Sequence, residues 1–99
     1  MAKKNKRIYI AGKVSGEKPE EVFHKFLAAE EKLKADGWEP VNPVRHCGAE
    51  WPWEKCMRAC VILLMGCDNI YLLKDWKRSR GARLERYIAL KLGMRVTKE

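Results

Sequence analysis

The sequence has no apolar stretch long enough to cross a membrane and no recognisable secretory signal. Its longest nearly unbroken apolar run covers residues 59–67, whereas a membrane-spanning helix needs ~20 residues. The apolar segment that follows the basic N-terminus, Ile8–Ala11, is shorter than the ~7–15-residue core of a secretory signal. We therefore expect a cytoplasmic protein with no membrane partner.

The chain also lacks internal repeats and low-complexity segments, and it has only four prolines among 99 residues. Its 46% of hydrophobic and 34% of charged residues are typical of a folded domain rather than a disordered chain. Chains divide into several hydrophobic cores only well beyond this length. We expect a basic tail at residues 1–6 followed by a single domain at residues 7–99.

No pair among the four cysteines has the C-x-x-C spacing that is typical of zinc and iron–sulfur sites. The cysteines are Cys47, Cys56, Cys60 and Cys67. Free cysteines behave as small, mostly buried apolar side chains. We expect reduced, largely buried thiols, and neither a metal nor a cofactor.

The net charge of +8 favours an anionic partner, which leaves nucleic acid, a nucleotide and an acidic protein open. No recognised nucleic-acid-binding motif is present, so nucleic acid ranks last. Part of the excess is a basic leader that reads as a solvated tail, with Lys3, Lys4, Lys6 and Arg7. A second basic cluster surrounds Ser79 and Gly81 and consists of Lys77, Arg78, Arg80 and Arg83.

Apolar periodicity and glycine positions predict alternating strands and helices. Strands are expected at residues 7–12, 38–41, 69–73 and 95–97, and helices at residues 19–36, 53–65 and 81–92. The expected inward-facing residues are Val22, Phe26, Ala29 and Leu33 in the first helix, Met57, Cys60 or Val61 and Leu64 in the second, and Leu84, Ile88 and Leu92 in the third.

This alternation predicts a three-layer α/β domain with a small parallel sheet and right-handed crossovers. Ligands in such sheets bind beyond the carboxyl ends of the strands, where the winding direction reverses. For the strand order 2-1-3-4, the crevice would lie between residues 12–16 and residues 74–83.

The loop before the last helix is a candidate phosphate site, because the first backbone N–H groups of a helix are free donors at its positive end. Ser79 could add a hydroxyl, Gly81 would permit close approach, and Arg80 or Arg83 would supply charge. The alternative is a serine N-cap followed by solvated arginines.

Glu85 lies about one turn into this helix and is a candidate nucleophile. The alternative is a glutamate that stabilises the helix N-terminus, an effect worth ~0.3–1 kcal/mol. Tyr9 on the first strand could hydrogen-bond to Glu85 or to a substrate, although a strand tyrosine commonly packs in the core. Trp76 could stack on a base, or it could cover the core or a subunit interface.

Four strings then combine into a resemblance: Y-I-A-G-K-V-S-G (residues 9–16), V-N-P (residues 41–43), C-D-N-I-Y-L-L (residues 67–73) and S-R-G-A-R-L-E (residues 79–85). Their order and spacing resemble a small bacterial and phage domain family of unknown function within the nucleoside 2-deoxyribosyltransferase superfamily. The resemblance covers roughly residues 7 to 96. It implies a flavodoxin-like α/β fold and a homodimer or larger homo-oligomer that closes the pocket.

The resemblance also implies an activity, because characterised relatives cleave the N-glycosidic bond of deoxynucleosides or nucleoside monophosphates through a glutamate nucleophile. That glutamate matches Glu85, the tyrosine that orients it matches Tyr9, and the first-loop glycine matches Gly12. Relatives that hydrolyse nucleotides carry a serine six residues before the nucleophile, and Ser79 stands there. Lys13 joins the expected phosphate-binding residues, and Asn42, Cys60 and Trp76 are candidate contacts to the base or sugar.

One position departs from the pattern: the relatives have an aspartate on the middle helix where this chain has Cys60. Glycosidases normally use two carboxyl groups, and a thiol with a pKa of about 8.5 is a poor proton donor. Asp68 and Asp75 are candidate replacements. The leading expectation is a nucleotide or nucleoside N-glycosidase or deoxyribosyltransferase-like enzyme. The alternatives are a non-catalytic nucleotide-binding module and a basic nucleic-acid accessory protein.

Overall fold

The computed structural model describes residues 6–48 and 50–99. Most of the expected basic tail, including Lys3 and Lys4, lies outside the described residues. The strands are β1 (Arg7–Ala11), β2 (Glu39–Val41), β3 (Asn69–Leu72) and β4 (Arg95–Lys98). The α-helices are α1 (Pro19–Ala35), α2 (Trp53–Met65) and α3 (Arg80–Lys91), and two short 3₁₀ helices are η1 (Pro43–Arg45) and η2 (Trp76–Arg78).

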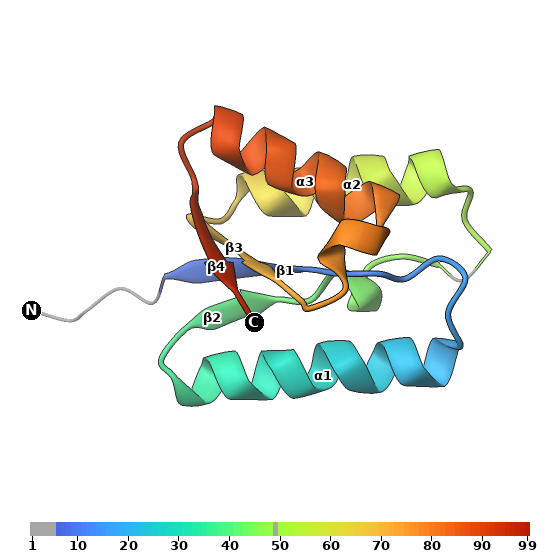
Figure 1. Ribbon diagram of the computed structural model, residues 1–99, viewed down its shortest axis with the longest axis horizontal. Helices are drawn as coiled ribbons and strands as arrows, with labels where there is room; N and C mark the ends of the chain where they lie inside the picture. Colours follow the sequence, from blue (N-terminus) through green and yellow to red (C-terminus); the bar gives the residue numbers. More distant parts are fainter. Residues whose placement is uncertain (1–5, 49) are drawn as a thin grey trace, which may run out of the picture.

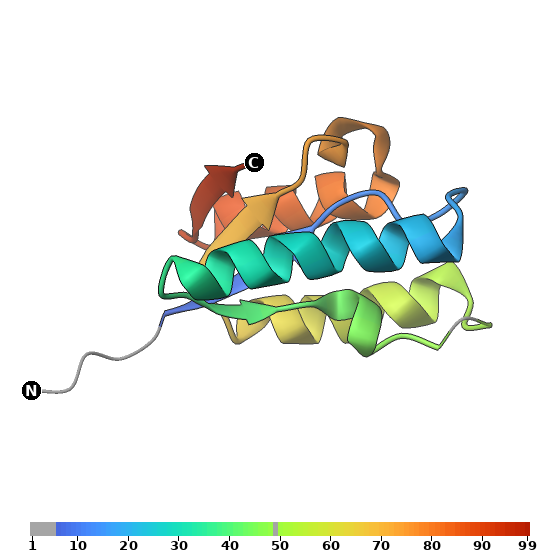
Figure 2. The ribbon, with the colours of Figure 1, turned by 90° about the horizontal axis from the view of Figure 1, so that it is seen from below.

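The four strands form one parallel sheet in the order β2-β1-β3-β4, as predicted. Helix α1 covers one face of the sheet, and α2 and α3 cover the other (Figure 1). Figure 2 shows α1 in front of the sheet, with α2 and α3 behind it. This is the expected three-layer, flavodoxin-like α/β fold. None of the helices within the described ranges has the length and apolar content that a membrane span requires.

The central strand β1 contributes side chains to two cores, one on each face of the sheet, because successive strand residues point to opposite faces. Ile8 and Ile10 pack with α1, whereas Tyr9 and Ala11 pack with α2 and α3. The inward face of α1 is as predicted, with Phe26 and Leu33 almost fully buried. Burying such a side chain contributes about 1.5–3 kcal/mol.

The inward face of α2 was also predicted correctly, since Met57, Cys60 and Leu64 are its buried residues. The inward face of α3 was predicted only in part: Ile88 packs against the core as expected, but the two leucines do not. Leu84 is 40% exposed and Leu92 62% exposed, and the helix instead buries Ala82, Glu85 and Ala89.

Close helix packing explains this difference. A Cβ added at Gly81 would lie 2.9 Å from Sδ of Met57 on α2, so α3 approaches its neighbours through small side chains. The face of α3 that carries these small residues also carries Glu85, which is buried together with Ala82 and Ala89. Two alanines and a glutamate do not produce a pattern of large apolar residues at helical spacing. The exposed leucines do, so they dominate the pattern in the sequence.

Candidate active site

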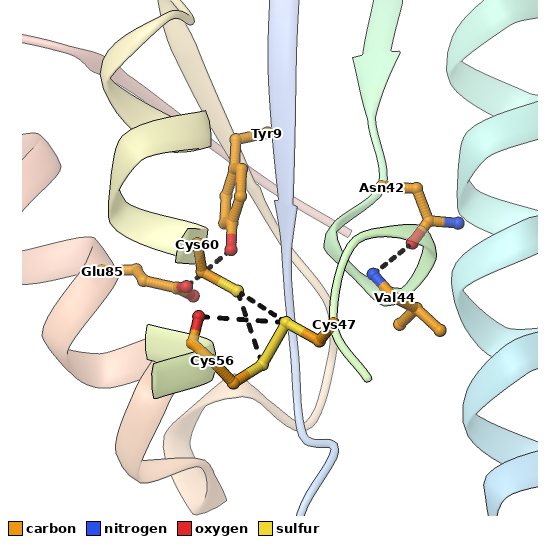
Figure 3. Close-up of a disulfide and its surroundings, with 7 residues drawn as sticks. All are labelled: Tyr9, Asn42, Val44, Cys47, Cys56, Cys60 and Glu85. Carbon is orange, nitrogen blue, oxygen red and sulfur yellow. Dashed lines mark hydrogen bonds between the residues drawn. A yellow bond between two sulfur atoms is a disulfide. The ribbon is translucent and has the colours of Figure 1, made fainter. Parts of the chain in front are cut away.

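Tyr9 and Glu85 form a buried pair between the central strand and α3. The Tyr9 hydroxyl donates a hydrogen bond of 2.6 Å to Oε2 of Glu85. Tyr9 is fully buried, and Glu85 is only 5% exposed. Figure 3 shows the tyrosine hydroxyl and the carboxylate directed toward each other. Of the two contacts proposed for Tyr9 from the sequence, the contact with Glu85 is the one present in the structure.

The local structure explains how the pair forms. Tyr9 is the third residue of β1 and packs in the core between the sheet and the α2–α3 layer. Glu85 lies beyond the first turn of α3, which contains no acidic residue. The alternative role for Glu85, a first-turn partner of the helix N-terminus, therefore does not describe its position.

Burial dominates the proton equilibria of this pair. Desolvation raises the pKa of Glu85 to about 7, although the hydrogen bond from Tyr9 acts in the opposite direction. Desolvation and the nearby Glu85 carboxylate raise the pKa of Tyr9 well above its ordinary value. Tyr9 therefore keeps its proton as the donor, while Glu85 changes charge near neutral pH.

Cys60 of α2 lies next to the Tyr9 hydroxyl (Figure 3). Its side chain is buried. Burial raises the pKa of the Cys60 thiol above its ordinary value. The thiol therefore remains protonated at neutral pH and is a poorer proton donor than a carboxylic acid.

The cysteines differ from the expectation of four reduced thiols, because Cys47 and Cys56 form a disulfide. The loop after η1 returns to the first turn of α2 and brings the two Cα atoms within 5.6 Å, a separation that a disulfide can bridge. Cys60 and Cys67 are free and buried, as expected. The sequence placed Cys56 and Cys60 one helical turn apart, but it contained no signal for the return of the loop.

Ser79 is the N-cap of α3. Its Oγ accepts a hydrogen bond of 3.0 Å from the Ala82 N–H and donates one of 3.3 Å to the Gly12 carbonyl. The cap proposed from the sequence is therefore present. The hydroxyl proton of Ser79 is also used, in the hydrogen bond to the Gly12 carbonyl. Among the described residues, the N–H groups of Arg80 and Gly81 have no hydrogen-bond partner.

The loops on either side of the expected crevice are tied together. The Lys13 N–H donates to Oδ1 of Asp75 at 3.0 Å, and the Lys25 ammonium donates to Oδ2 of Asp75 at 2.6 Å and to the Lys13 carbonyl at 2.7 Å. Burial alone would raise the pKa of Asp75, but the hydrogen bonds from Lys25 and Lys13 hold it below its ordinary value. Lys25 was not among the residues predicted from the sequence, because a lysine on a helix surface gives no signal of a distant partner.

Neither candidate replacement acid is suited to its role. The low pKa of Asp75 keeps this carboxyl group ionised at neutral pH. Asp68 is exposed and immediately precedes β3, so it lies at the amino end of the strand, whereas the site lies toward the carboxyl ends. Within the described residues, Glu85 has no second carboxyl group as a hydrogen-bond partner.

Asn42 has structural partners on both sides of its amide. Its Nδ2 donates to Oε1 of Glu30 at 2.9 Å, and its Oδ1 accepts from the Val44 N–H at 3.0 Å (Figure 3). It caps η1 and holds a buried glutamate of α1. Figure 3 also places Asn42 on the other side of β1 from Glu85, so the structure does not bring it to the Tyr9–Glu85 pair.

Trp76, Arg80 and Gly12 lie around the carboxyl ends of β1 and β3. Trp76 is half-buried in η2, and the exposed Arg80 guanidinium lies 3.8 Å from the ring centroid of Trp53. A Cβ added at Gly12 would lie 2.6 Å from Cδ1 of Leu73. The close approach at Gly12 is therefore an approach to Leu73 within the protein.

Other side chains cover Glu85 almost completely, since only 5% of its surface is exposed. Two hollows on the described surface have volumes of about 250 Å³ and about 270 Å³, and Glu85 lines neither of them. The second hollow lies at the carboxyl ends of β3 and β4 and includes Trp76 and Lys77.

Comparison with known proteins gives one match. A family model described as "Domain of unknown function (DUF4406)" matches residues 6–98. The matched range contains every residue of the candidate site. No curated protein and no solved structure matches the chain.

Proposed function

The chain belongs to the DUF4406 family of domains of unknown function, and we propose that it cleaves the N-glycosidic bond of a nucleotide or nucleoside with Glu85 as the nucleophile. One observation carries the proposal: a buried carboxylate that accepts a hydrogen bond of 2.6 Å from a buried tyrosine. A structural ion pair would supply a cation to such a carboxylate, but here the partner is a neutral donor. This arrangement orients Glu85 and leaves its second oxygen for chemistry.

In the proposed reaction, a carboxylate oxygen of Glu85 attacks the anomeric carbon of the sugar as the carbon–nitrogen bond breaks. The base leaves with the bonding electron pair and takes up a proton from solvent water. Water or a second base then attacks the same carbon, releases the sugar and regenerates the carboxylate. Tyr9 holds the carboxylate in place in both steps.

A nucleotide is favoured over a nucleoside because the N-terminus of α3 offers anion donors close to Glu85. The free N–H groups of Arg80 and Gly81 lie at the positive end of this helix, where a phosphate is stabilised. The exposed Arg80 side chain can add charge. Ser79 would join only by exchanging its bond with Gly12 for one to the phosphate.

Substrate entry requires an opening of the site, since Glu85 is 5% exposed. The side chains that cover Glu85 must move aside while the hydrogen bond between Glu85 and Tyr9 stays intact. We propose that substrate binding drives this opening.

A second candidate function, a non-catalytic nucleotide-binding module, is favoured by the missing acid. Cys60 has a raised thiol pKa, Asp75 is held ionised by Lys25, and Asp68 lies at the other end of β3. In this alternative, the phosphate site at α3 is used for binding, and Glu85 and Tyr9 only complete the core.

The test is chromatography of free base released from a panel of ribonucleoside and deoxynucleoside 5′-monophosphates, with an acceptor base in half of the samples. Wild type, Glu85→Gln and the control Glu31→Gln, an exposed glutamate on the opposite face of the sheet, are run together. Release by wild type and Glu31→Gln but not by Glu85→Gln supports the enzyme. Nucleotide binding in calorimetry with no base release by any of them supports the binding module instead.

A further inference from the structure

Three cysteine sulfurs meet beside the Tyr9–Glu85 pair. The Sγ atoms of Cys47, Cys56 and Cys60 all lie within 4.8 Å of one another. Sγ of Cys60 lies 3.7 Å from that of Cys47 and 4.0 Å from that of Cys56. We propose that the reduced protein binds one Zn²⁺ ion through the thiolates of these three cysteines.

The spacing of the sulfurs fits this ion. Zinc–sulfur bonds of about 2.3 Å in a tetrahedral arrangement separate two sulfur ligands by roughly 3.8 Å. Both separations that involve Cys60 are close to this value. The third pair, Cys47 and Cys56, is joined as a disulfide and reaches the same separation only after reduction.

The fold places the ligands where a metal site can form. Cys56 and Cys60 are one turn apart on α2, and residues at this spacing lie on the same side of a helix. Cys47 comes from the loop between η1 and α2. A loop ligand can move outward when the disulfide opens, without displacing the helix or the sheet.

The chemistry of the donors selects a soft, tetrahedral ion. Three thiolates favour Zn²⁺ over Mg²⁺ or Ca²⁺, which prefer oxygen ligands. Within residues 6–48 and 50–99, the group contains three cysteines and no His, Asp or Glu. Cys47 and Cys56 are only half-buried, so water completes the coordination in the fourth position, as in zinc sites with three protein ligands.

Loading the site requires a reductant and releases protons. A dithiol transfers two electrons and two protons to the Cys47–Cys56 disulfide and becomes a disulfide itself. The two resulting thiols and the thiol of Cys60 then bind Zn²⁺ as thiolates and release three protons. Zinc and the disulfide therefore exclude each other, and each state holds the loop after η1 against α2.

This inference does not depend on the proposed function, because its readout is metal binding. The full chain is reduced, freed of reductant under anaerobic conditions and titrated with Co²⁺, whose thiolate charge-transfer absorption reports sulfur ligation. Zn²⁺ is then added to displace the cobalt. The protein with its disulfide intact is titrated in parallel.

Cys67 provides a matched control, because it is a buried free cysteine outside the group. We expect one equivalent of Co²⁺ to bind to the reduced wild type and to Cys67→Ser. Cys47→Ser and Cys60→Ser should each weaken binding by more than the roughly 10–100-fold that loss of a second-shell partner costs. No stoichiometric binding by the reduced wild type, or an equal loss in Cys67→Ser, would overturn the proposal.

A second measurement uses only wild-type protein, so it does not depend on whether the cysteine variants fold. Reduced wild-type protein is alkylated with and without Zn²⁺, and the modified cysteines are mapped by mass spectrometry. We expect Zn²⁺ to slow the alkylation of Cys47 and Cys56 by at least roughly tenfold, because metal-bound thiolates are held in the coordination sphere. Alkylation at the same rate with and without Zn²⁺ would contradict the site.

Discussion

The hydroxyl of Tyr9 lies 2.6 Å from the carboxylate of Glu85, although 76 positions separate the two residues in the chain. The contact joins the central strand to the last helix inside the core. It combines an uncharged donor with a carboxyl group whose pKa burial raises to about 7. The charge of Glu85, the hydrogen bond that orients it and the packing around it can therefore each be tested by substitution.

The first prediction concerns the donor. In Tyr9→Phe, Glu85 loses the hydrogen bond that lowers its pKa, so the pKa should rise further above about 7. Removing one partner of a buried bond should also cost about 1–3 kcal/mol of unfolding free energy. Carbon-13 NMR titration of the Glu85 carboxyl measures the pKa directly. Tyr87→Phe, an exposed tyrosine on α3, is the control and should leave the titration unchanged.

The second prediction concerns the pH dependence of stability. The pKa of Glu85 is about 7 in the folded protein and near the ordinary 4.5 when unfolded, so between these values the folded state binds more protons. Its contribution to the free energy of unfolding should therefore decrease as pH rises from about 4.5 to about 7, by about 3 kcal/mol in all.

Urea unfolding of the wild type and Glu85→Gln across this pH range checks the second prediction. The free energy of unfolding of the wild type minus that of Glu85→Gln should decrease as pH rises, because glutamine does not titrate. Glu31→Gln should follow the wild type. A difference that stays constant with pH would show that burial does not raise the pKa of Glu85 above its value in the unfolded chain.

The third prediction compares two glycines. An added Cβ at Gly12 would lie 2.6 Å from Cδ1 of the fully buried Leu73, whereas at Gly81 it would meet the flexible end of Met57 at 2.9 Å. Gly12→Ala should destabilise the protein by about 1–3 kcal/mol through overpacking. Gly81→Ala should cost less, because Met57 can move and alanine favours the helix by up to ~1 kcal/mol. Midpoints of urea unfolding decide the order, and a larger loss for Gly81→Ala would contradict this account of the packing.

The fourth prediction concerns the link between the two crevice loops. Asp75 has a lowered pKa because it accepts hydrogen bonds from Lys25 and the Lys13 N–H, despite the opposing effect of burial. The stability that it contributes should be fully present above its ordinary pKa of 3.8 and lost as pH falls through the lower folded value.

Asp75→Asn tests the fourth prediction. It should destabilise the protein at pH 7, by about 1–3 kcal/mol for a charged hydrogen bond, and the difference from wild type should shrink in acid. Asp36→Asn, which removes an exposed partner of Lys32 on α1, should have little effect. Equal losses at neutral and acid pH would show that the Asp75 charge is not what joins the loops.

The sequence predicted the order of the elements and the strand order, because the two central strands, β1 and β3, are short and mostly apolar, and each long helix has glycine or proline near its ends. The inward faces of α1 and α2 followed from large apolar residues at helical spacing. The face of α3 followed only at Ile88, because the rest of this helix packs through Gly81, Ala82 and Ala89 and buries a glutamate. Hydrophobic periodicity cannot detect a face made of small residues.

The candidate site was predicted in part. The contact of Tyr9 with Glu85 and the Ser79 cap were anticipated from residue types near the carboxyl ends of neighbouring strands. The disulfide and the Lys25–Asp75 bond depend on how loops return to helices, and no local pattern encodes that return. The nucleotide substrate, the homo-oligomer and the cytoplasmic location stay predictions.

In the proposed reaction, Glu85 forms a covalent bond to the sugar. The most direct test quenches the protein in acid during a single turnover with the nucleotide that releases base fastest, and locates the added mass by peptide mapping. We expect a sugar phosphate on the peptide that contains Glu85 in the wild type and no adduct in Glu85→Gln. Base release by Glu85→Gln at the wild-type rate, with no adduct on Glu85 at any quench time, would contradict it.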